Sequence, residues 1–411
     1  MAATDTKFYI VELRSGSTLA PARNAHLKAV KAWCQADTHS KLRRTMLHDS
    51  LDYYAYTGKF TAAVMRQIKA DTTVIDAVNE GQPVENADTT GSITNNSSSW
   101  WLTDIAPVPP AVLPHNVPAN AVWYSPETQG EGVDVYVVDE GFGDLKKDSD
   151  FQGRNIEKLW PGMNEGEAEP FLDEAIKKDD QHGYYVARLA AGHLSSPAPK
   201  SNLCWISYLG QEINNAVSNI GVVEALSEVW MRIDSPTRQA VRTSVINCSW
   251  GVSLPHPERD ILARLCQKIA EKVVFVAACG NQGKPMDKIQ PVPAWLPETI
   301  SVGCSERDAD RAANFSNWGD RVDLYAPGTE IRLTDEKGYL TPVSKFEGTS
   351  FSAPLVTGAV ACLLSGAKAA NTSLKPSEVR ELLLSRARTF TIQKPGEKPR
   401  RAKKLVVLPY P

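Results

Sequence analysis

Three side chains of the kinds that perform nucleophilic catalysis stand far apart in the sequence, each beside an apolar run. Asp139 ends VDVYVVD, His182 precedes GYYVARLAA, and Ser350 opens the small-residue run SFSAPLVTG. A serine hydroxyl is a weak nucleophile that needs a base, and an imidazole oriented by a carboxylate is such a base. The three residue types therefore predict acyl transfer, with Ser350 as nucleophile, His182 as base and Asp139 as the orienting carboxylate.

A fourth side chain suits the negative charge that develops in such a reaction. Asn281 follows the apolar run VVFVAACG, and its amide N–H groups can donate to an oxyanion. The backbone N–H of Ser350 is the expected second donor, because the first N–H groups of a helix lack intrahelical partners. Taken singly, each residue has a commoner role as a cap, turn or structural residue, so the hypothesis depends on their occurring together.

The elements that must position these residues follow from the hydrophobic pattern. Short β-branched runs without polar alternation predict strands buried on both faces of a parallel sheet: VDVYVVD, SVINCSW, VVFVAACGN, TISVGC and VDLYAPG. Helical spacing is found at 183–191, 217–230, 257–272 and 350–368. Strands alternating with helices predict an α/β fold with a doubly wound parallel sheet, whose ligands bind at the carboxyl ends of the strands.

The N-terminal part predicts a separate small α+β unit over residues 7–84. KFYIVELR, LDYYAYTGKF and TTVIDAV have strand character, whereas 26–36 and TAAVMRQIKA have helical spacing. Residues 81–99 have the Asn, Ser, Thr and Gly content of a linker, and the Pro-rich stretch 100–118 is expected to be extended. At the other end, the Lys and Arg of 393–404 favour a solvated tail, and KLVVLPYP is compatible with a last edge strand.

Composition bounds the class of protein. The chain has 411 residues, 42% of them apolar and 23% charged, which is typical of a globular protein with a large core. A net charge of -3 gives no argument for nucleic acid or an anionic membrane, and no uncharged run is long enough to span a bilayer. The start of the chain lacks the pattern of a signal peptide, so an intracellular location is favoured, with a secreted or vacuolar one if a leader was removed. The seven cysteines lack metal-ligand spacing and are expected to be reduced core residues.

In combination, the motifs resemble those of subtilisin-like serine proteases. The aspartate motif of that family is similar to VVDEG, the histidine motif to HGYYVA and the serine motif to GTSFSAPLVTG. The substrate-strand motif is similar to VINCSWG, and the oxyanion-asparagine motif to AACGNQG. PAWLPETISVGC and ANFSNWGDRVDLYAPG resemble the stretch between the asparagine and the serine. The chain order Asp, His, Ser is that of subtilisin. The N-terminal unit resembles the family's inhibitor-type propeptide, which is a small α+β sandwich.

The resemblance implies a domain plan and a function. Residues 1–85 would be a propeptide-like domain that assists folding and blocks the cleft, 86–118 a linker and extended segment, 119–392 the subtilisin-like catalytic domain, and 393–411 a basic tail. The protein would be a serine endopeptidase made as a zymogen. Its partners would be a peptide or protein substrate and its own propeptide, with no nucleic acid and no membrane, and a monomer is expected.

The resemblance also implies substrate-binding residues. An open strand edge that pairs with the substrate backbone would be formed by Ser249, Trp250 and Gly251. One wall of the specificity pocket would be lined by Ala277, Ala278 and Cys279, and Gly280 would turn the chain toward the cleft. No cofactor is expected. Calcium stays open, because loop 193–204 lacks the family's Asn-rich calcium segment and no ligands are identifiable.

Several positions depart from the family pattern. Glu140 follows the aspartate, Tyr184 and Tyr185 follow the histidine motif's first two residues, and Arg188 stands where a glycine normally packs the helix. Trp250 replaces a smaller residue and is expected to narrow nearby pockets. Two other functions therefore stay open: a peptide-maturing or macrocyclising transpeptidase on the same fold, and a pseudoprotease that only binds peptides.

Overall fold

A nine-stranded sheet carries the larger part of the molecule. The computed structural model describes residues 6–81, 85–86, 89–90, 100–105, 127–159, 181–208, 212–213, 216–217, 219–235, 243–254, 260–307, 311–334, 340–342, 346–392 and 397–405. The strand order of this sheet is β21-β22-β17-β16-β14-β12-β7-β9-β8. Its strands are β7 (Val133–Asp139), β8 (Ile156–Leu159), β9 (Asn202–Ser207), β12 (Thr243–Cys248), β14 (Val274–Ala278), β16 (Ile300–Ser305), β17 (Leu324–Pro327), β21 (Arg388–Ile392) and β22 (Arg400–Lys404).

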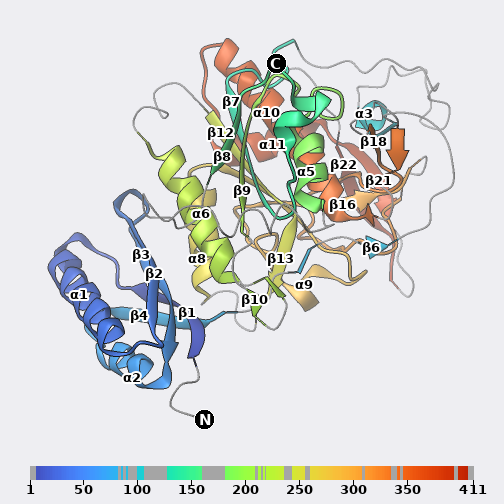
Figure 1. Cartoon of the computed structure of the whole chain (residues 1–411). Helices are drawn as coiled ribbons and strands as arrows, with labels where there is room; N and C mark the ends of the chain where they lie inside the picture. The colour runs from blue at the N-terminus through green and yellow to red at the C-terminus, as the bar shows by residue number, and fades with distance from the viewer. Residues whose placement is uncertain are drawn as a thin grey trace.

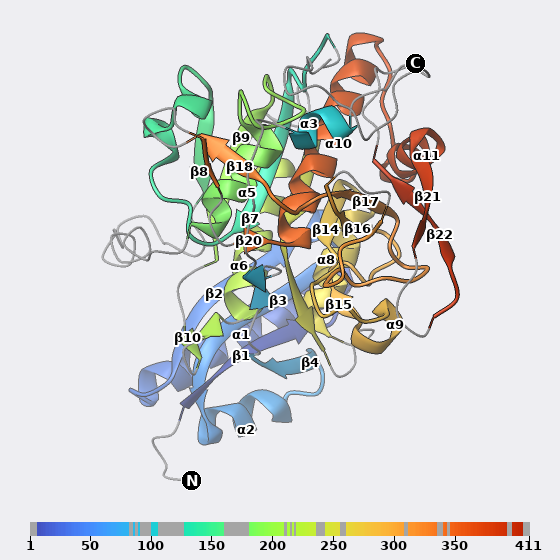
Figure 2. The same ribbon diagram turned by 90° about the vertical axis from the view of Figure 1, so that its right-hand side faces the viewer.

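All pairings in this sheet are parallel except the one between β21 and β22, which lie at one edge (Figure 2). The predicted α/β fold with a parallel sheet is therefore confirmed. Because side chains alternate along a strand, both faces of β7 are apolar: Val135 and Val137 face one core, and Tyr136 and Val138 face the other.

Helices cover both faces of the sheet (Figure 1). The first core is shared with α5 (His182–Ala191), α10 (Thr349–Ala369) and α11 (Pro376–Arg386), and the second with α6 (Asn219–Ile233) and α8 (Ile261–Ala270). By length and composition α10 would suffice to cross a membrane, but 94% of its most apolar window is buried inside the protein. Its apolar character is that of a central core helix.

The N-terminal unit is a four-stranded antiparallel sheet with two helices, seen at the lower left of Figure 1. Its elements are β1 (Thr6–Leu13), α1 (Ala20–Ala36), β2 (Lys41–His48), β3 (Tyr53–Thr61), α2 (Ala62–Ala70) and β4 (Ile75–Glu80), in the strand order β2-β3-β1-β4. One face of the sheet packs against α1 and α2, and the other joins the core beneath α6 and α8. The predicted α+β unit is present, with β2 as a strand that the sequence pattern did not indicate.

The segment after this unit differs from the expected plain linker. β5 (Glu85–Asn86) pairs with β13 (Trp250–Ser253), and β6 (Thr89–Thr90) pairs with β20 (Phe346–Glu347). The stretch expected to be extended begins instead with a helix, α3 (Trp100–Ile105), whose Leu102 and Ile105 are buried in the main core. Residues 106–118 of that stretch lie outside the described residues.

The basic tail also differs from a solvated one. Arg400–Lys404 forms β22 inside the sheet, and the buried Lys404 pairs with Asp104 of α3 at 3.0 Å. The ion pair explains how a lysine is tolerated there, since it compensates the loss of solvation. Residues 406–411, which hold most of the expected edge strand, lie outside the described residues.

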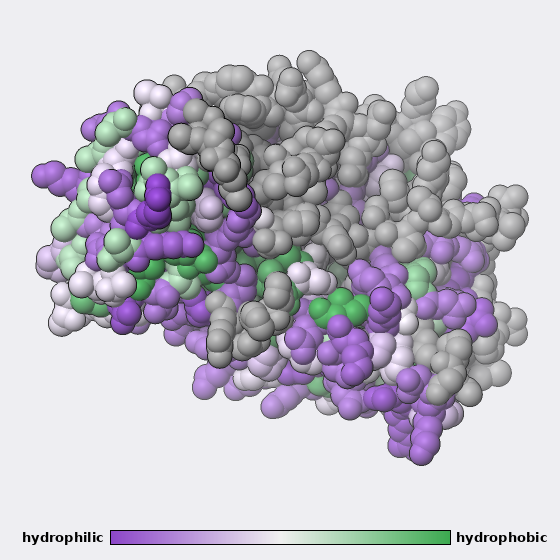
Figure 3. Space-filling view, turned by 90° about the horizontal axis from the view of Figure 1, so that it is seen from below, coloured by the Kyte–Doolittle hydropathy of each residue, from purple (hydrophilic) through white to green (hydrophobic). Residues whose placement is uncertain are grey.

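The remaining described elements are short. They are α9 (Met286–Ile289), β10 (Glu212–Ile213), β11 (Ala216–Val217), β15 (Pro291–Val292), β18 (Arg332–Thr334), β19 (Leu340–Pro342) and the 3-10 turns Ser17–Leu19, Asp49–Leu51, Leu145–Lys147 and Ser149–Phe151. Seen from below, hydrophilic side chains dominate the described surface and hydrophobic ones form small patches (Figure 3). All seven cysteines are free thiols, and only Cys34 is not buried.

Candidate active site

Asp139 and His182 meet where β7 ends and α5 begins. The Asp139 Oδ1 atom lies 2.7 Å from His182 Nδ1, and both side chains are fully buried. The first turn of α5 is held against the chain after β7, because Gly183 N donates to the carbonyl of Glu140 at 2.6 Å. A Cβ at position 183 would clash with that same carbonyl, so the close approach needs glycine. A carboxylate partner holds the proton on Nδ1, which leaves Nε2 as the nitrogen that can accept one.

Ser350 is the second residue of α10 and belongs to its first turn. Its Oγ donates to the carbonyl of Ser249 at 3.0 Å, and Ser249 Oγ donates back to the carbonyl of Ser350 at 2.8 Å. The next residue, Phe351, carries the link to the histidine, with ring centroids of His182 and Phe351 5.9 Å apart. The structure therefore gathers the serine, the histidine and the aspartate at the carboxyl end of the parallel sheet.

Asn281 approaches the same helix start, and its amide orientation follows from its contacts. Its Oδ1 accepts from the backbone N–H of Thr349 at 3.0 Å and from Thr349 Oγ1 at 2.9 Å. Its Nδ2 is buried and has no hydrogen-bond acceptor among the described residues. A buried N–H without an acceptor is costly, so this donor is suited to a ligand oxygen that arrives at the site.

The loop that carries Asn281 is held by a residue that sequence reasoning missed. The fully buried Asn317 donates to the Cys279 carbonyl at 2.7 Å and accepts from the backbone of Gln282 at 3.1 Å. Gly280 has a φ of +97°, and a Cβ there would lie 2.6 Å from Asn317 Nδ2. The predicted turn at Gly280 is therefore a left-handed one that also needs the space of a missing side chain.

A strand, β13, lies where the substrate strand was predicted, but its tryptophan has an unexpected place. Trp250 and Gly251 pair with Asn86 and Glu85 of β5. The Trp250 indole is fully buried in the core, where its Nε1 donates to the Val138 carbonyl at 2.8 Å. Because the ring lies in the core, its hydrogen bond holds the strand that ends in Asp139. The Trp250 side chain therefore does not narrow a substrate pocket, in contrast to the expectation.

The three residues assigned to one pocket wall alternate between the two faces of the sheet. Ala277 and Cys279 belong to the core beneath α6 and α8, whereas Ala278 faces the core that contains α10. Ala277 and Ala278 are successive residues of β14, so their side chains point to opposite faces of the sheet, and Cys279 follows the strand. The assignment of the three residues to one wall of the specificity pocket stays a prediction.

Arg188, which departs from the family pattern, has a clear partner. The buried guanidinium contacts Asp150 at 2.9 Å and Asp148 at 3.6 Å. Burial lowers the pKa of Arg188, but Asp150 and Asp148 outweigh it and raise that pKa above its ordinary value. The pair ties α5, which begins with His182, to the 3-10 turn Ser149–Phe151.

Within the described part of the chain, no cluster of three or more His, Cys, Asp or Glu side chains is placed to hold a metal ion.

Comparisons with known proteins identify the family of this chain. The model of the subtilase family matches residues 130–403. Subtilisin-like protease 3 of Arthroderma benhamiae is 28% identical over 362 residues, which is 87% of this chain and 82% of the relative.

Two solved structures extend the comparison. The crystal structure of a cold-adapted subtilisin-like serine proteinase is 25% identical with a TM-score of 0.55, over 76% of this chain and 99% of the other. The epidermin leader peptide processing serine protease from Staphylococcus aureus has a TM-score of 0.64 at 18% identity, over 98% of this chain and 97% of its own. That second match shows a shared fold, and it extends over the N-terminal unit. The chain belongs to the subtilase family and is a subtilisin-like serine protease, a hydrolase of peptide bonds.

Proposed function

We propose that the protein is a serine endopeptidase whose acyl-enzyme forms on Ser350, and that it is made as a zymogen with residues 1–85 as the inhibitory domain. The observation that carries the first part is the buried 2.7 Å contact between Asp139 and His182 beside the first turn of α10. An oriented imidazole, a helix-start hydroxyl and an amide donor without an acceptor are the groups that acyl transfer requires.

The reaction follows from these positions. Ser350 Oγ bonds to the substrate carbonyl carbon while its proton passes to His182 Nε2, and Asp139 stabilises the imidazolium. The oxyanion accepts hydrogen bonds from Asn281 Nδ2 and the backbone N–H of Ser350. The C–N bond breaks as His182 gives its proton to the leaving amine. Water then attacks the ester by the same route and restores the serine hydroxyl.

The docking of the N-terminal unit supports the zymogen proposal. Arg43 donates to both oxygens of the buried Glu224, at 2.9 and 2.8 Å, and Arg44 pairs with Glu228 at 2.6 Å. Strand β2 has a register shift between Leu42 and Arg44, and such a bulge can turn successive side chains to one side. The two glutamates stand one helical turn apart on α6, where they face this side.

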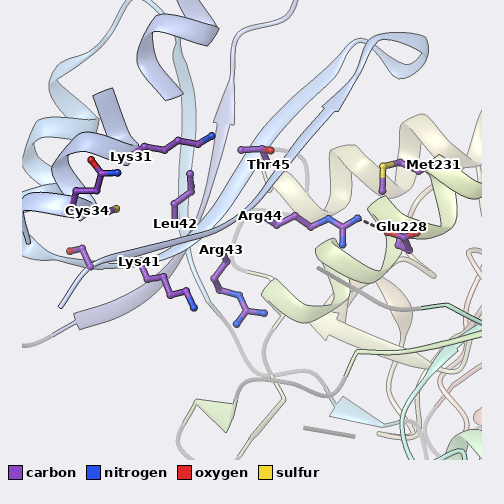
Figure 4. A pocket seen from close by; sticks show the side chains of 11 residues that line it. Lys31, Cys34, Lys41, Leu42, Arg43, Arg44, Thr45, Glu228 and Met231 are labelled. Atoms are coloured by element: carbon purple, nitrogen blue, oxygen red, sulfur yellow. Dashed lines mark hydrogen bonds and ion pairs between the residues drawn. The ribbon is translucent and has the colours of Figure 1, made fainter. Parts of the chain in front are cut away.

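Figure 4 shows Arg44 reaching toward Glu228 beside a cavity of about 620 Å³ between the N-terminal unit and α6. Further polar contacts cross the same boundary: His48 to Ser227 at 2.7 Å, Trp230 to Ser50 at 3.1 Å and Lys268 to the Leu51 carbonyl at 3.0 Å. A docked unit of this kind, followed by β5 on the substrate strand, would keep other chains out of the cleft.

The test compares the intact mass of wild-type protein with that of Ser350→Ala after incubation. Wild type is expected to lose its N-terminal unit by a single internal cut, and Ser350→Ala to keep its full mass. Product masses also separate hydrolysis, which adds a water, from cyclisation, which loses one. The proposal fails if both proteins stay intact and neither cleaves an added unfolded protein.

A further inference from the structure

The cavity between the N-terminal unit and α6 is lined by more cations than anions. Lys31 of α1 and Lys41, Arg43 and Arg44 of β2 line it, together with one carboxylate, Glu228 of α6. Its volume of about 620 Å³ lies within the range of small-molecule sites, which is roughly 300–1,000 Å³. Figure 4 shows the two lysines on one side of the cavity and Glu228 on the other. The cavity therefore combines a surplus of positive charge with room for a ligand.

Two local features of the sequence bring the lining residues together. Lys31 and Gln35 are four residues apart on α1, so they share one face of that helix. Strand β2 shifts its register just before Arg44, so side chains on both sides of the shift reach the same cavity. The lining residues from α6 are Glu228 and the half-exposed Met231. All cations that line the cavity thus come from the N-terminal unit.

Ion pairs neutralise the two arginines of the cavity but not its two lysines. Arg44 uses its Nη2 for Glu228, at 2.6 Å, and no acceptor for its Nε is found in the described part of the chain. Among the described residues, Lys31 and Lys41 form no ion pair, and both are exposed to solvent. Positive charge without a counter-charge in a recess concentrates anions. An anion from solution can therefore reach both lysines and the unused donors of Arg44.

We propose that this cavity binds a small phosphorylated molecule and that the bound ligand weakens the docking of the N-terminal unit. Lys31 and Lys41 hold phosphate oxygens as point charges, and Arg44 adds N–H donors in one plane. The effect on docking follows from the charges, because the catalytic unit brings a carboxylate, Glu228, that repels an anion and competes for Arg44. Ligand binding and docking therefore oppose each other, and by linkage each lowers the affinity of the other.

The regulatory part of this inference rests on the proposed function and deepens it. If the docked N-terminal unit keeps other chains out of the cleft, a ligand that weakens docking acts as a release signal. The cavity needs both units, since its cations belong to one and its opposite wall to α6 of the other. An enzyme that has lost its N-terminal unit should therefore not respond to the ligand.

Titration calorimetry of the full-length Ser350→Ala protein with pyrophosphate tests the binding site. Lys31→Gln/Lys41→Gln should weaken binding about tenfold or more, because two charge-assisted contacts are lost. The matched control Lys28→Gln/Lys69→Gln removes the same charge from exposed positions of α1 and α2 outside the cavity and should bind as Ser350→Ala does. No binding to Ser350→Ala, or equal weakening in both double variants, overturns the site. Citrate that binds as tightly as pyrophosphate overturns the phosphate class.

Hydrogen exchange of α6 amides in the same proteins tests the effect on docking. Pyrophosphate should speed this exchange about threefold or more over potassium chloride of equal ionic strength, and Lys31→Gln/Lys41→Gln should abolish the difference. An equal effect of both salts, or slower exchange with pyrophosphate, overturns the opposition between ligand and docking. Fluorophosphonate labelling of wild type separates the two failures. A chain that is labelled at Ser350 but does not respond to pyrophosphate overturns this inference alone, whereas one that responds but is not labelled contradicts the proposed function.

Discussion

Asn281 can present its amide N–H groups to a substrate because its oxygen is already committed. Thr349 donates to that oxygen through both its backbone N–H and its Oγ1, and the same Oγ1 accepts from Gly280 N at 3.1 Å. One threonine thus couples the loop after β14 to the start of α10. The donor is oriented before any substrate arrives, which is the condition under which such groups lower a barrier.

Replacing Asn281 by alanine should lower kcat by about 10²–10³ and change KM little, because the lost hydrogen bond forms mainly in the transition state. Steady-state hydrolysis of an unfolded protein substrate measures both constants. Lys288→Ala, on the exposed helix α9, is the matched control. A kcat within twofold of wild type for Asn281→Ala would remove this residue from the mechanism.

Trp250→Phe should cost about 1 kcal/mol of unfolding free energy, because it removes the indole donor to the Val138 carbonyl and keeps an aromatic ring in the core. Urea unfolding of the variant on a Ser350→Ala background avoids self-cleavage during the measurement. An unchanged midpoint would mean that the hydrogen bond to the strand of Asp139 carries no net stability.

Asp139, His182 and Ser350 could be proposed as a set because Asp139 ends a buried strand, where α/β folds place their ligands, and the other two open apolar helices. Thr349 and Asn317 were not predictable, since their roles come from tertiary contacts and threonine and asparagine have many local uses in loops. The place of Trp250 was also missed, because a strand pattern does not tell which neighbouring carbonyl an indole will reach.

Among the elements, α5 is held by a buried ion pair in addition to its buried apolar residues. Arg188 lies among Asp150, Asp148 and the ring of Tyr184. Asp150 also accepts from Ser195 Oγ at 2.6 Å, so the pair holds the chain on both sides of the helix. Because Arg188 and His182 belong to the same helix, we expect the ion pair to act on His182 only through the position of that helix.

Arg188→Met should destabilise the fold by about 3–5 kcal/mol, because it leaves a buried carboxylate without its cation. Adding Asp150→Asn should recover part of that loss. Chemical unfolding of both single variants and the double variant forms a mutant cycle. Additive losses would show that the two side chains do not act together.

Five of the buried parallel strands, β7, β12, β14, β16 and β17, were predicted with near-correct bounds, because their apolar runs are short and rich in β-branched residues. The parallel strands β8 and β9 were missed. Strand β2 was missed, since KLRRTMLH lacks alternation and its register shift follows Leu42. The α3 helix was missed for another reason. Its Pro-rich surroundings suggest extended chain, whereas Leu102 and Ile105 are buried in the main core and tertiary packing decides the local structure.

For the whole molecule, the boundary between the two units contains a titratable group. His48 is 5% exposed and contacts Ser227 of α6. Burial, with the charge of Arg44 added, lowers the pKa of His48 to about 4, while Asp234 and Asp49 act in the opposite direction. Above its ordinary pKa of 6.5, His48 is neutral in both states and its contribution to the docked state is fully present. This contribution is lost as the pH falls toward 4, because the docked state disfavours the protonated histidine.

Docking of the N-terminal unit should therefore weaken as the pH falls from 6.5 toward 4, because the docked state disfavours the protonated form of His48. Hydrogen exchange of α6 amides in Ser350→Ala, followed across this range, measures the effect. His48→Gln keeps a polar partner for Ser227 and should flatten the pH dependence, whereas the exposed His39→Gln should not. An unchanged pH profile in His48→Gln would exclude His48 as the titrating group.

The proposed mechanism requires Ser350 as the nucleophile and His182 as the base that activates it. The most direct test of these two roles is the rate and position of labelling by a fluorophosphonate, mapped by mass spectrometry of peptides. We predict one label on Ser350 in wild type, none in Ser350→Ala, and labelling slowed at least a hundredfold in His182→Ala. Labelling at a different serine, or an equal rate in His182→Ala, would contradict the account.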